Sequence, residues 1–483
     1  MSTTDTTPTE LEQVLACADT AATAWAARSA AERAAGLRAA ADGLDAAAEQ
    51  LLPVAGEESH LPQARLTGEL KRTTFQLRLF AEMLDDGGYL DARIDHADDA
   101  WPMGARPDIR RVLEPLGPVV VFAASNFPFA FSVAGGDTCS ALAAGCSVVV
   151  KVHPGHPELS ALVGAVVAES LTSAGAPEGL LQLVYGIDAG RVALLDPRIK
   201  AAAFTGSIPG GRALFDLAVS RPEPIPFYGE LGSVNPTFVT QAAAADRGGD
   251  IVAAFLGSFT MGAGQFCTKP GILLVPEESG MVQALAGSEL PAAAPLLNDR
   301  IQSGYVSVLK ELLEHPAVTA LGSTAGSFDA PPAPTLIATT AAALVADPEG
   351  LATECFGPTA LVATYSDEAE LLDVARVIDG QLTATIHGEE SDVVAPELIR
   401  LLARKAGRVL WNQWPTGVSV TYAQQHGGPY PATTAPTTTS VGTASISRFL
   451  RPVAYQGLPA HLLPSALRDE NPLNIPQRVN GAL

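Results

Sequence analysis

The sequence predicts an α/β protein with parallel sheets, and two patterns support this prediction. Short, continuously apolar runs, first at residues 119–123, 146–152 and 180–184, alternate with segments of helical periodicity. Strands buried on both faces have this continuous apolar character, so we expect helices to cover both faces of the sheet. At 483 residues the chain exceeds a single hydrophobic core, and we therefore expect two or three domains.

The region before the first apolar run is predicted to be helical. Residues 10–86 are rich in Ala, Leu, Glu and Arg at helical spacing, with interruptions expected at Pro53 and Pro62. We expect these helices to pack on the surface of a larger body. Residues 109–113 have mixed character and are predicted to form a strand outside the main sheet.

The remaining elements follow in order. A helix ending at residues 141–144, a helix at 159–174 and a strand at 201–204 complete the first α/β unit. A second unit is expected to comprise a strand at 234–239, a helix at 251–261, a strand at 271–275, a helix at 306–313 and a strand at 361–364. Residues 429–483 are rich in Pro and Thr, which indicates an arm rather than a domain with its own core.

The composition argues against several classes of protein. The formal net charge is −22, from 52 acidic against 30 basic residues, so neither nucleic acid nor a membrane is an expected partner. The five cysteines are odd in number and lack CxxC spacing, which indicates neither a disulfide framework nor a metal site. The N-terminus does not resemble a signal peptide, and no apolar run reaches the roughly 20 residues that span a bilayer. We expect a soluble, cytoplasmic protein without a metal.

The most informative segment is Gly-Gln-Phe-Cys-Thr at residues 264–268. Cys267 follows a flexible, glycine-rich run that lets the backbone approach a ligand closely, and an accessible, ionised thiol is a strong nucleophile. Upstream, Glu230 stands between small residues and can act as a base. Taken alone, such a cysteine is more often a core residue, so a catalytic interpretation depends on the segments that accompany it.

Further segments place polar or small residues after predicted strands. Asn126 lies just past the first buried strand, where an amide can donate to a developing oxyanion, and Lys151 ends the next strand. Residues 206–211 form a Gly-x-x-x-x-Gly turn before a helix, which suits a phosphate at the helix N-terminus. Residues 353–358 add an acid and an aromatic residue before a Gly-Pro turn. Each segment, taken alone, is also compatible with an ordinary turn or a solvated side chain.

In this order and spacing, the segments resemble the NAD(P)-dependent aldehyde dehydrogenase superfamily over nearly the whole chain. Residues 151–157, 415–418, 426–433 and 448–453 further resemble the branch of α-ketoglutaric semialdehyde (2,5-dioxopentanoate) dehydrogenases and NADP-preferring fatty-aldehyde dehydrogenases. The sequence departs from the superfamily pattern twice. Ser233 follows Gly232 where a second glycine is usual, and Pro154 stands where many NAD-dependent members carry a glutamate.

The resemblance implies covalent catalysis. Cys267 would form a thiohemiacetal and then a thioester, Asn126 and the Cys267 N–H would hold the oxyanion, and Glu230 would activate the hydrolytic water. The implied cofactor is NADP or NAD, and the residues implied to bind it are Lys151, Gly206, Ser207, Gly211, Glu354, Phe356, Arg191 and His153.

Within this set, Lys151 and Glu354 are expected at the ribose hydroxyls, Phe356 at the nicotinamide, and the two glycines at the pyrophosphate. Because Pro154 removes a repulsive carboxylate, we expect NADP to be accepted at least as well as NAD, with Arg191 near the 2′-phosphate.

Three histidines lie in or near these segments. His153 and His156 are interpreted either as loop residues or as ligands of the 2′-phosphate. His426 is interpreted as a turn residue near the pocket rather than as a proton shuttle.

The substrate pocket is expected to be apolar and is predicted to be lined by Phe127, Phe129, Gln265, Thr268 and Trp414. Oxidation of 2,5-dioxopentanoate to 2-oxoglutarate and oxidation of a medium- or long-chain fatty aldehyde both stay open. A CoA-acylating enzyme would lack Glu230, and a non-catalytic relative would not need Cys267, Glu230 and Asn126 together.

The resemblance also implies a division into domains. A Rossmann-like cofactor domain is predicted at residues 1–231, with about 105–116 joining an oligomerisation arm. The catalytic α/β domain is predicted at 232–428, and the rest of the arm and the tail at 429–483. Since the arm of the family pairs with a neighbouring subunit, we expect a homodimer or homotetramer that acts on a small aldehyde.

Overall fold

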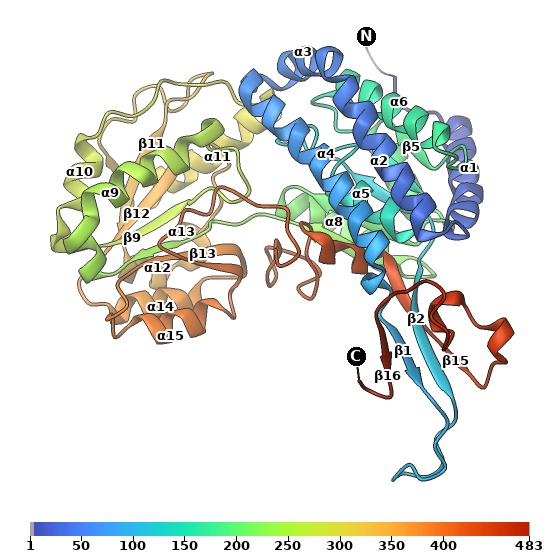
Figure 1. Cartoon of the computed structure of the whole chain (residues 1–483). Coiled ribbons are helices and arrows are strands. Elements are labelled where there is room, and N and C mark those ends of the chain that lie inside the picture. The colour runs from blue at the N-terminus through green and yellow to red at the C-terminus, as the bar shows by residue number, and fades with distance from the viewer. Residues whose placement is uncertain (1–3, 483) are drawn as a thin grey trace.

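The protein is described from a computed structural model that defines residues 4–482. Two α/β lobes lie side by side, and a narrow arm projects below the first of them (Figure 1). Each lobe contains one sheet, and a third sheet forms the arm. None of the helices in these residues is long and apolar enough to cross a membrane.

Residues 8–86 are helical, as predicted, and form four helices. Their bounds are α1 Pro8–Ala26, α2 Ala30–Ala46, α3 Ala48–Ser59 and α4 Gln63–Asp86. Thr7 and Ser29 begin the first two with capping boxes, each using a glutamate three residues later. The break expected at Pro62 is confirmed, whereas the one at Pro53 is wrong: the chain turns at Ala47, and Pro53 lies inside α3. Burial of Leu51 and Ala55 keeps this segment helical despite the proline.

The sheet of the first lobe is parallel throughout, in the order β5-β4-β3-β6-β7. Its strands are β3 Val119–Phe122, β4 Val148–Lys151, β5 Leu181–Val184, β6 Ala201–Thr205 and β7 Phe227–Glu230. The connecting helices are α5 Gly136–Ala144, α6 Pro157–Ser173, α7 Ile187–Leu195 and α8 Ile208–Ser220. The predicted strands and helices of this unit are confirmed, and β7, which carries Glu230, is an addition.

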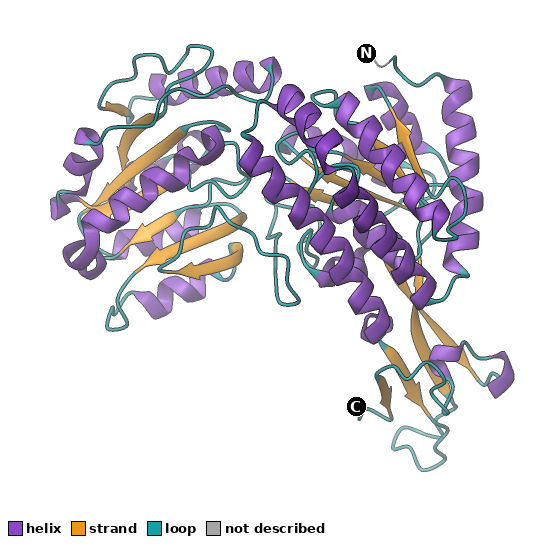
Figure 2. Ribbon diagram, turned by 45° about the horizontal axis from the view of Figure 1, so that its top comes forward, coloured by secondary structure: helices purple, strands orange, loops and turns teal. Residues whose placement is uncertain are grey.

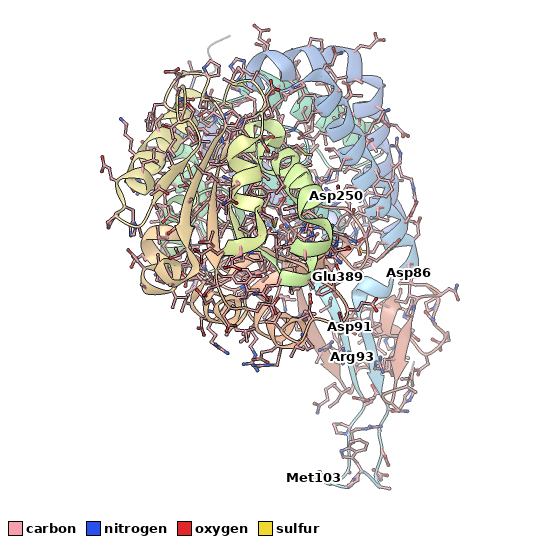
Figure 3. The ribbon with its side chains drawn as sticks, turned by 90° about the vertical axis from the view of Figure 1, so that its left-hand side faces the viewer. Asp86, Asp91, Arg93, Met103, Asp250 and Glu389 are labelled. Carbon is pink, nitrogen blue, oxygen red and sulfur yellow. The ribbon has the colours of Figure 1, made fainter. Side chains whose placement is uncertain are left out.

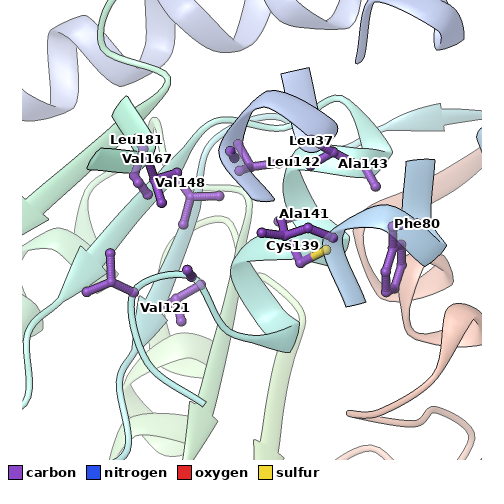
Figure 4. Close-up of a cluster of buried hydrophobic side chains, with 14 of the residues drawn as sticks. Leu37, Phe80, Val121, Cys139, Ala141, Leu142, Ala143, Val148, Val167 and Leu181 are labelled. Carbon is purple, nitrogen blue, oxygen red and sulfur yellow. The ribbon is translucent and has the colours of Figure 1, made fainter. Parts of the chain in front are cut away.

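Alternate residues of these strands face two separate helical layers. Val121 packs in the core formed with α2 to α6, and Figure 4 shows it in one cluster with Leu37, Leu142 and Val167. Val120 instead contacts the layer formed by α1, α7 and α8. The continuous apolar runs therefore have the cause inferred from the sequence, which is burial of both faces.

The sheet of the second lobe has the order β10-β11-β12-β9-β8-β13-β14, and only β10 runs antiparallel to its neighbour. Its strands are β8 Thr237–Val239, β9 Ile272–Pro276, β10 Thr319–Leu321, β11 Thr335–Thr340, β12 Thr359–Tyr365, β13 Gln381–His387 and β14 Ala406–Trp411. Its helices are α9 Gln241–Thr260, α10 Met281–Gly287, α11 Asp299–Glu314, α12 Ala341–Ala346, α13 Pro348–Leu351, α14 Ala369–Val377 and α15 Ala395–Leu402. Helices α9 and α10 cover one face, while α11, α12, α14 and α15 cover the other (Figure 2).

The arm is a four-stranded sheet in the order β15-β2-β1-β16. Its strands are β1 Ala92–Asp95, β2 Ile109–Pro115, β15 Leu450–Gln456 and β16 Gln477–Val479. The strand expected outside the main sheet at residues 109–113 is thus confirmed as part of β2. The C-terminal segment shares a small core with β1 and β2 and does not form one of its own. Met103, 91% exposed, marks the tip of the β1–β2 hairpin (Figure 3).

Candidate active site

Three side chains from distant parts of the chain meet between the two lobes. The Nε2 atom of His426 lies 3.5 Å from Cys267 Sγ and 2.9 Å from Glu230 Oε1. Glu230 and His426 are buried, and Cys267 is partly buried. A thiol, a carboxylate and an imidazole at these distances can exchange a proton, which is the basis of nucleophile activation.

Glu230 is positioned by a strand. It is the last residue of β7, where it pairs with Thr205 of β6 and forms an isolated bridge with Thr433. The next residue, Leu231, donates its N–H to the carbonyl of Ala432 at 2.8 Å. The hydroxyl of Ser440 donates to Glu230 Oε2, so one carboxylate oxygen is fixed while the other faces His426.

Cys267 is positioned by a loop with an unusual backbone. The short helix η2 Met261–Gly264 contains three successive residues with positive φ, namely Gly262, Ala263 and Gly264. For Ala263 this conformation is strained, and such strain persists only where the surroundings hold it. A Cβ on Gly264 would lie 2.1 Å from the carbonyl oxygen of Gly357, so only glycine allows these two loops to pack.

Buried polar side chains hold this loop. Asn235 Nδ2 donates to the carbonyls of Cys267 and Lys269 at 2.8 and 2.9 Å. The Gln265 side chain donates to Gly262 O at 3.1 Å and accepts from Leu297 N–H at 2.9 Å. The sequence did not point to Asn235, whose partners lie more than thirty residues away.

Lys269 is the strongest of these supports. Its buried ammonium donates to three backbone carbonyls of the neighbouring loop, those of Cys355, Gly357 and Thr359. The loop of Cys267 and the loop of Glu354 are thereby joined. Lys269 lies two residues after Cys267, but sequence alone gave no reason to distinguish it from a solvated lysine.

His426 is the functional candidate that sequence reasoning underestimated. It lies in an irregular segment, as expected, but its ring faces Cys267 and Glu230. The backbone is held by Thr439 Oγ1, which accepts its N–H at 2.8 Å, and by Ser440, whose N–H donates to its carbonyl at 2.8 Å. Because His426 and Cys267 are 159 residues apart, no local pattern could have paired them.

The electrostatics of the cluster favour a protonated thiol next to an ionised acid. Burial and the carboxylate of Glu230 together raise the pKa of Cys267 well above its ordinary value. Burial alone would raise the pKa of Glu230 too, but the charge of His426, when protonated, and hydrogen bonds from His426, Ser440 and Cys267 outweigh burial and lower it. The resting pair is therefore a thiol that can transfer its proton to a neighbouring base.

These three groups are also zinc donors. Their ligand atoms all lie within 4.8 Å of one another, which is compatible with coordination of one ion. The sequence-based expectation of no metal considered only motif spacing, and it could not reveal donors brought together from three distant segments. The same distances suit transfer of the thiol proton to the imidazole or the carboxylate, which is an acid–base role.

Asn126 lies beside the cluster, in the loop after β3. One hydrogen of its amide donates to Gln265 O at 3.2 Å, which leaves the second hydrogen available. The backbone carbonyl of Asn126 accepts a hydrogen bond from Arg65 Nη2 at 2.6 Å.

Aromatic rings form one side of the adjoining space. The ring of Phe127 lies 5.4 Å from that of Phe131 and 5.3 Å from that of Phe266, and Phe131 lies 6.4 Å from His426. All three phenylalanines are partly exposed, as pocket-lining residues must be.

The other predicted pocket residues lie outside this space or make other contacts. Phe129 is fully buried in the core of the first lobe, so it is left out of the proposed pocket. Gln265 is engaged in holding its own loop. Trp414 packs on His387 and Phe255, with ring centroids 4.6 and 5.7 Å away. Thr268 is buried, and its hydroxyl has no hydrogen-bond partner within residues 4–482.

The C-terminal edge of the first sheet suits a dinucleotide. The chain order reverses between β3 and β6, and ligands of open α/β sheets bind at such a switch point. Lys151 ends β4 there, and Ser207 caps α8 by accepting from Gly210 N–H at 3.4 Å. The N-terminus of α8 therefore offers backbone N–H groups at the place where a pyrophosphate would bind.

The glycines of this turn are also required by packing. A Cβ on Gly206 would approach the Phe204 ring to 2.6 Å, and one on Gly211 would approach Leu231 Cδ2 to 2.1 Å. Arg191 is exposed on α7, next to Gly190, whose missing side chain makes room for Lys151.

The loop that carries Glu354 and Phe356 contacts both lobes. Burial raises the pKa of Glu354 to about 7, against the opposing effects of Lys269 and of the Ser233 N–H. Ser233, the departure from the superfamily pattern, uses its hydroxyl to bond Asn235 and Gln381, both at 2.9 Å. The substitution thus adds anchoring to this turn. Phe356 is partly buried.

The two histidines after β4 differ in role. His156 is buried and bonded to Ala124 O and Ser160 Oγ at 2.9 and 3.0 Å, which makes it a structural residue. His153 accepts the Gly155 N–H at Nδ1, so its Nε2 carries the proton of the neutral ring. Burial, His156, Lys151 and Arg300 lower the pKa of His153 to about 3, so it is uncharged at neutral pH.

The fold and the site agree with the family to which this chain belongs. Residues 1–431 match the aldehyde dehydrogenase family, and the chain belongs to it. The family is NAD(P)-dependent, and the protein is accordingly an oxidoreductase.

Individual members of the family are also similar to this chain. The chain is similar to the α-ketoglutaric semialdehyde dehydrogenase of Acinetobacter baylyi, at 45% identity over 90% of this chain and 84% of the relative. α-Ketoglutaric semialdehyde dehydrogenase 2 of Azospirillum brasilense is 44% identical over 98% and 91% of the two chains. Among solved structures, betaine aldehyde dehydrogenase of Staphylococcus aureus in complex with NAD+ has the same fold, with a TM-score of 0.76 over 93% of this chain and 88% of that one, at 20% identity.

Proposed function

We propose that this chain oxidises 2,5-dioxopentanoate to 2-oxoglutarate with NAD(P)+, through covalent intermediates on Cys267. The observation that carries the proposal is the contact of Cys267 and Glu230 with one imidazole, His426. The two relatives at 44–45% identity, named for the same semialdehyde, support the choice of substrate.

In the first step Cys267 attacks the aldehyde carbon while its proton moves to Glu230 or His426 and from there to solvent, which leaves Glu230 ionised for the later step. The resulting thiohemiacetal bears an oxyanion, which the Cys267 N–H and the free amide hydrogen of Asn126 stabilise. Arg65 and Gln265 keep this amide in place through the two bonds described above.

When bound, NAD(P)+ supplies the hydride acceptor that turns the thiohemiacetal into a thioester. Lys151, Ser207 and the N-terminus of α8 would hold the cofactor, together with the loop of Glu354 and Phe356. Glu230 then removes a proton from the water that hydrolyses the thioester. Ser440 holds one carboxylate oxygen and leaves the other for this task.

For the cofactor, we propose that NADP is accepted at least as well as NAD. Pro154 offers no carboxylate, and neutral His153 can donate a hydrogen bond from Nε2 to a phosphate. Arg191 supplies a nearby cation. Replacing Arg191 by Ala should weaken NADP binding about tenfold and leave NAD binding unchanged, as measured by fluorescence titration. A strong NAD preference in the wild type would refute this assignment.

The experiment that tests the proposed reaction is a substrate panel with both cofactors. Purified protein should reduce NAD(P)+ with 2,5-dioxopentanoate and yield 2-oxoglutarate in equal amount. A chain that oxidises no aldehyde with either cofactor would exclude the proposed activity.

A second substrate class is supported by the aromatic wall. Phe127, Phe131 and Phe266 offer apolar contact that suits the chain of a medium- or long-chain fatty aldehyde. Decanal is therefore part of the panel. A kcat/KM for decanal above that for 2,5-dioxopentanoate would favour this alternative.

We further propose a homodimer or homotetramer in the cytoplasm. Strand β15 lies at an edge of the arm sheet, where its unpaired backbone can add to a neighbouring subunit. Exposed apolar residues at the arm, such as Met103 and Leu462, suit burial in such an interface. The five free cysteines suit a reducing compartment. A stable, active monomer at micromolar concentration in sedimentation would contradict the oligomer.

A further inference from the structure

Three arginines surround the space in front of Cys267. Two of them already donate to backbone carbonyls, although Nε and Nη1 of Arg65 and Nε of Arg408 have no partner among residues 4–482. Arg65 donates to the carbonyl of Asn126, as described. Arg408 of β14 donates to Gly417 O at 2.8 Å and to Pro415 O at 2.7 Å, and so supports the loop that follows the strand. Arg72 of α4 makes no hydrogen bond or ion pair to any residue in the range 4–482.

The position of Arg72 is fixed by its helix. It lies one turn after Glu69 on α4, and Glu69 is anchored by accepting the N–H groups of Phe129 and Ala130 at 2.8 and 3.0 Å. The Arg72 guanidinium carbon lies 5.4 Å from the centroid of the Phe131 ring. Because Phe131 also contacts His426, the same ring adjoins both the Arg72 guanidinium and the catalytic cluster.

The charge of Arg72 acts on the reacting groups. Burial lowers the pKa of Arg72, while the negative charges of Glu69, Cys267 and Glu230 oppose this effect. Burial and Glu230 raise the pKa of Cys267, and the charge of Arg72 offsets a small part of this rise. The contact of Arg72 with Phe131, whose ring also adjoins His426, therefore places the guanidinium beside the space in front of the thiol.

A partly buried guanidinium with unused donors is costly to maintain without a ligand. Its planar fork is suited to bind a carboxylate through two parallel hydrogen bonds, and the face of Phe131 holds its plane. The chain has a formal net charge of −22, so an arginine that faces the pocket without an acidic partner stands out.

We propose that Arg72 binds the carboxylate of the substrate, at the end of the molecule opposite to the aldehyde. This inference rests on the proposed function and adds a requirement to it: the substrate is an aldehyde that also carries a carboxylate. Phe127 and Phe131 contact the carbon chain between the two ends. An uncharged fatty aldehyde would leave the guanidinium desolvated and without a partner, so the pocket discriminates against it.

The test compares 2,5-dioxopentanoate with its methyl ester and with pentanal, which share the aldehyde but lack the carboxylate. We expect Arg72→Gln to lower kcat/KM for the acid by about 10- to 100-fold, mainly through KM. The ester and pentanal should change by less than about threefold. Arg72→Lys keeps the charge but not the fork, and should lie between wild type and Arg72→Gln for the acid alone.

Arg78→Gln is the matched control, because Arg78 lies on the same helix and pairs at the surface with Asp42 and Asp45. It should leave all three substrates unchanged. Equal losses on acid, ester and pentanal in both Arg72 variants, or no loss on the acid, would overturn the assignment of Arg72. A wild type that oxidises pentanal and the acid equally well would overturn the carboxylate site while leaving the dehydrogenase intact. A wild type inactive on all aldehydes would overturn the proposed function itself.

Discussion

The two lobes present their reactive groups by different means. In the first lobe, Lys151 and Glu230 are the last residues of β4 and β7, so neighbouring strands fix their backbone through the ladder of hydrogen bonds. In the second lobe, Cys267 lies on a strained loop that the side chains of Asn235, Gln265 and Lys269 hold. A group on a strand is positioned by many equivalent contacts, whereas a group on this loop depends on a few polar ones. The loop is thus the more sensitive to single substitutions.

The largest effect is expected from removing the reactive group of the loop without removing its supports. Cys267→Ala should reduce aldehyde oxidation by about 10,000-fold or more, because no other group can form the thioester. Cofactor binding, measured by fluorescence titration, should survive. Cys17→Ala, at an exposed cysteine, is the control and should be fully active. More than a trace of turnover in Cys267→Ala would contradict the proposed nucleophile.

The corresponding change on the strand should slow a different step. Glu230→Gln should lower steady-state turnover by about 1,000-fold, because the amide cannot accept the proton of water. A pre-steady-state burst of NAD(P)H should persist or grow, since the thioester still forms. The burst is measured by stopped-flow absorbance of NAD(P)H, with the enzyme and the aldehyde in comparable amounts. Loss of the burst with turnover intact would be incompatible with this role.

The comparison between the two lobes is tested by removing a side chain that supports the loop of Cys267. Lys269→Met leaves three buried carbonyls without their donor and should lower the free energy of unfolding by about 2–4 kcal/mol. Activity should fall by about 100-fold, because the loops of Cys267 and Glu354 are no longer joined. Lys310→Met, at an exposed lysine of the same lobe, serves as the control. If Lys269→Met melted and reacted like the wild type, the loop would not depend on its polar supports.

The smallest effect, about tenfold on kcat at optimal pH, is expected for His426→Gln. Burial is the leading influence on Glu230, and His426 is the first of the groups that oppose it. Without the imidazole the pKa of Glu230 should rise, and because the base must be ionised, the acidic limb of kcat should move to higher pH. A pH–rate profile measures this shift, and an unchanged acidic limb would show that His426 does not govern the carboxylate.

Much of the fold could be predicted from the sequence because burial leaves a local signature. The valine-rich runs of β3 and β4 identify strands covered on both faces, and every strand predicted in the first lobe is present. Strand β13, by contrast, alternates Thr and Gln with apolar residues and is nonetheless completely buried. The polar side chains of Gln381 and Thr383 are satisfied by distant partners, Ser233 and Asn235, and composition cannot reveal such pairs.

The residues of the site also divide into those that the sequence could predict and those that it could not. Cys267, Glu230, Asn126 and Lys151 stand in short motifs at strand or loop ends, where their spacing is visible. His426 and Arg72 contribute through space, from segments that carry no motif for the chemistry of the residues they face. Their roles follow only from the packing of α4 and of residues 426–440 against the first sheet.

The contact between Gly264 and Gly357 bears on how sequence variation among relatives should be interpreted. Any side chain at residue 264 would overlap a backbone oxygen, and the positive φ disfavours one independently. Constancy of this glycine in an alignment would therefore report a limit of space rather than a chemical task. A change at Gln265 or Lys269 has no such steric bar. The partners of these two side chains at residues 297 and 355 are backbone groups, which any residue other than proline supplies. Variation at Gln265 or Lys269 would therefore trace how evolution has rebuilt the support of the thiol while keeping the thiol itself.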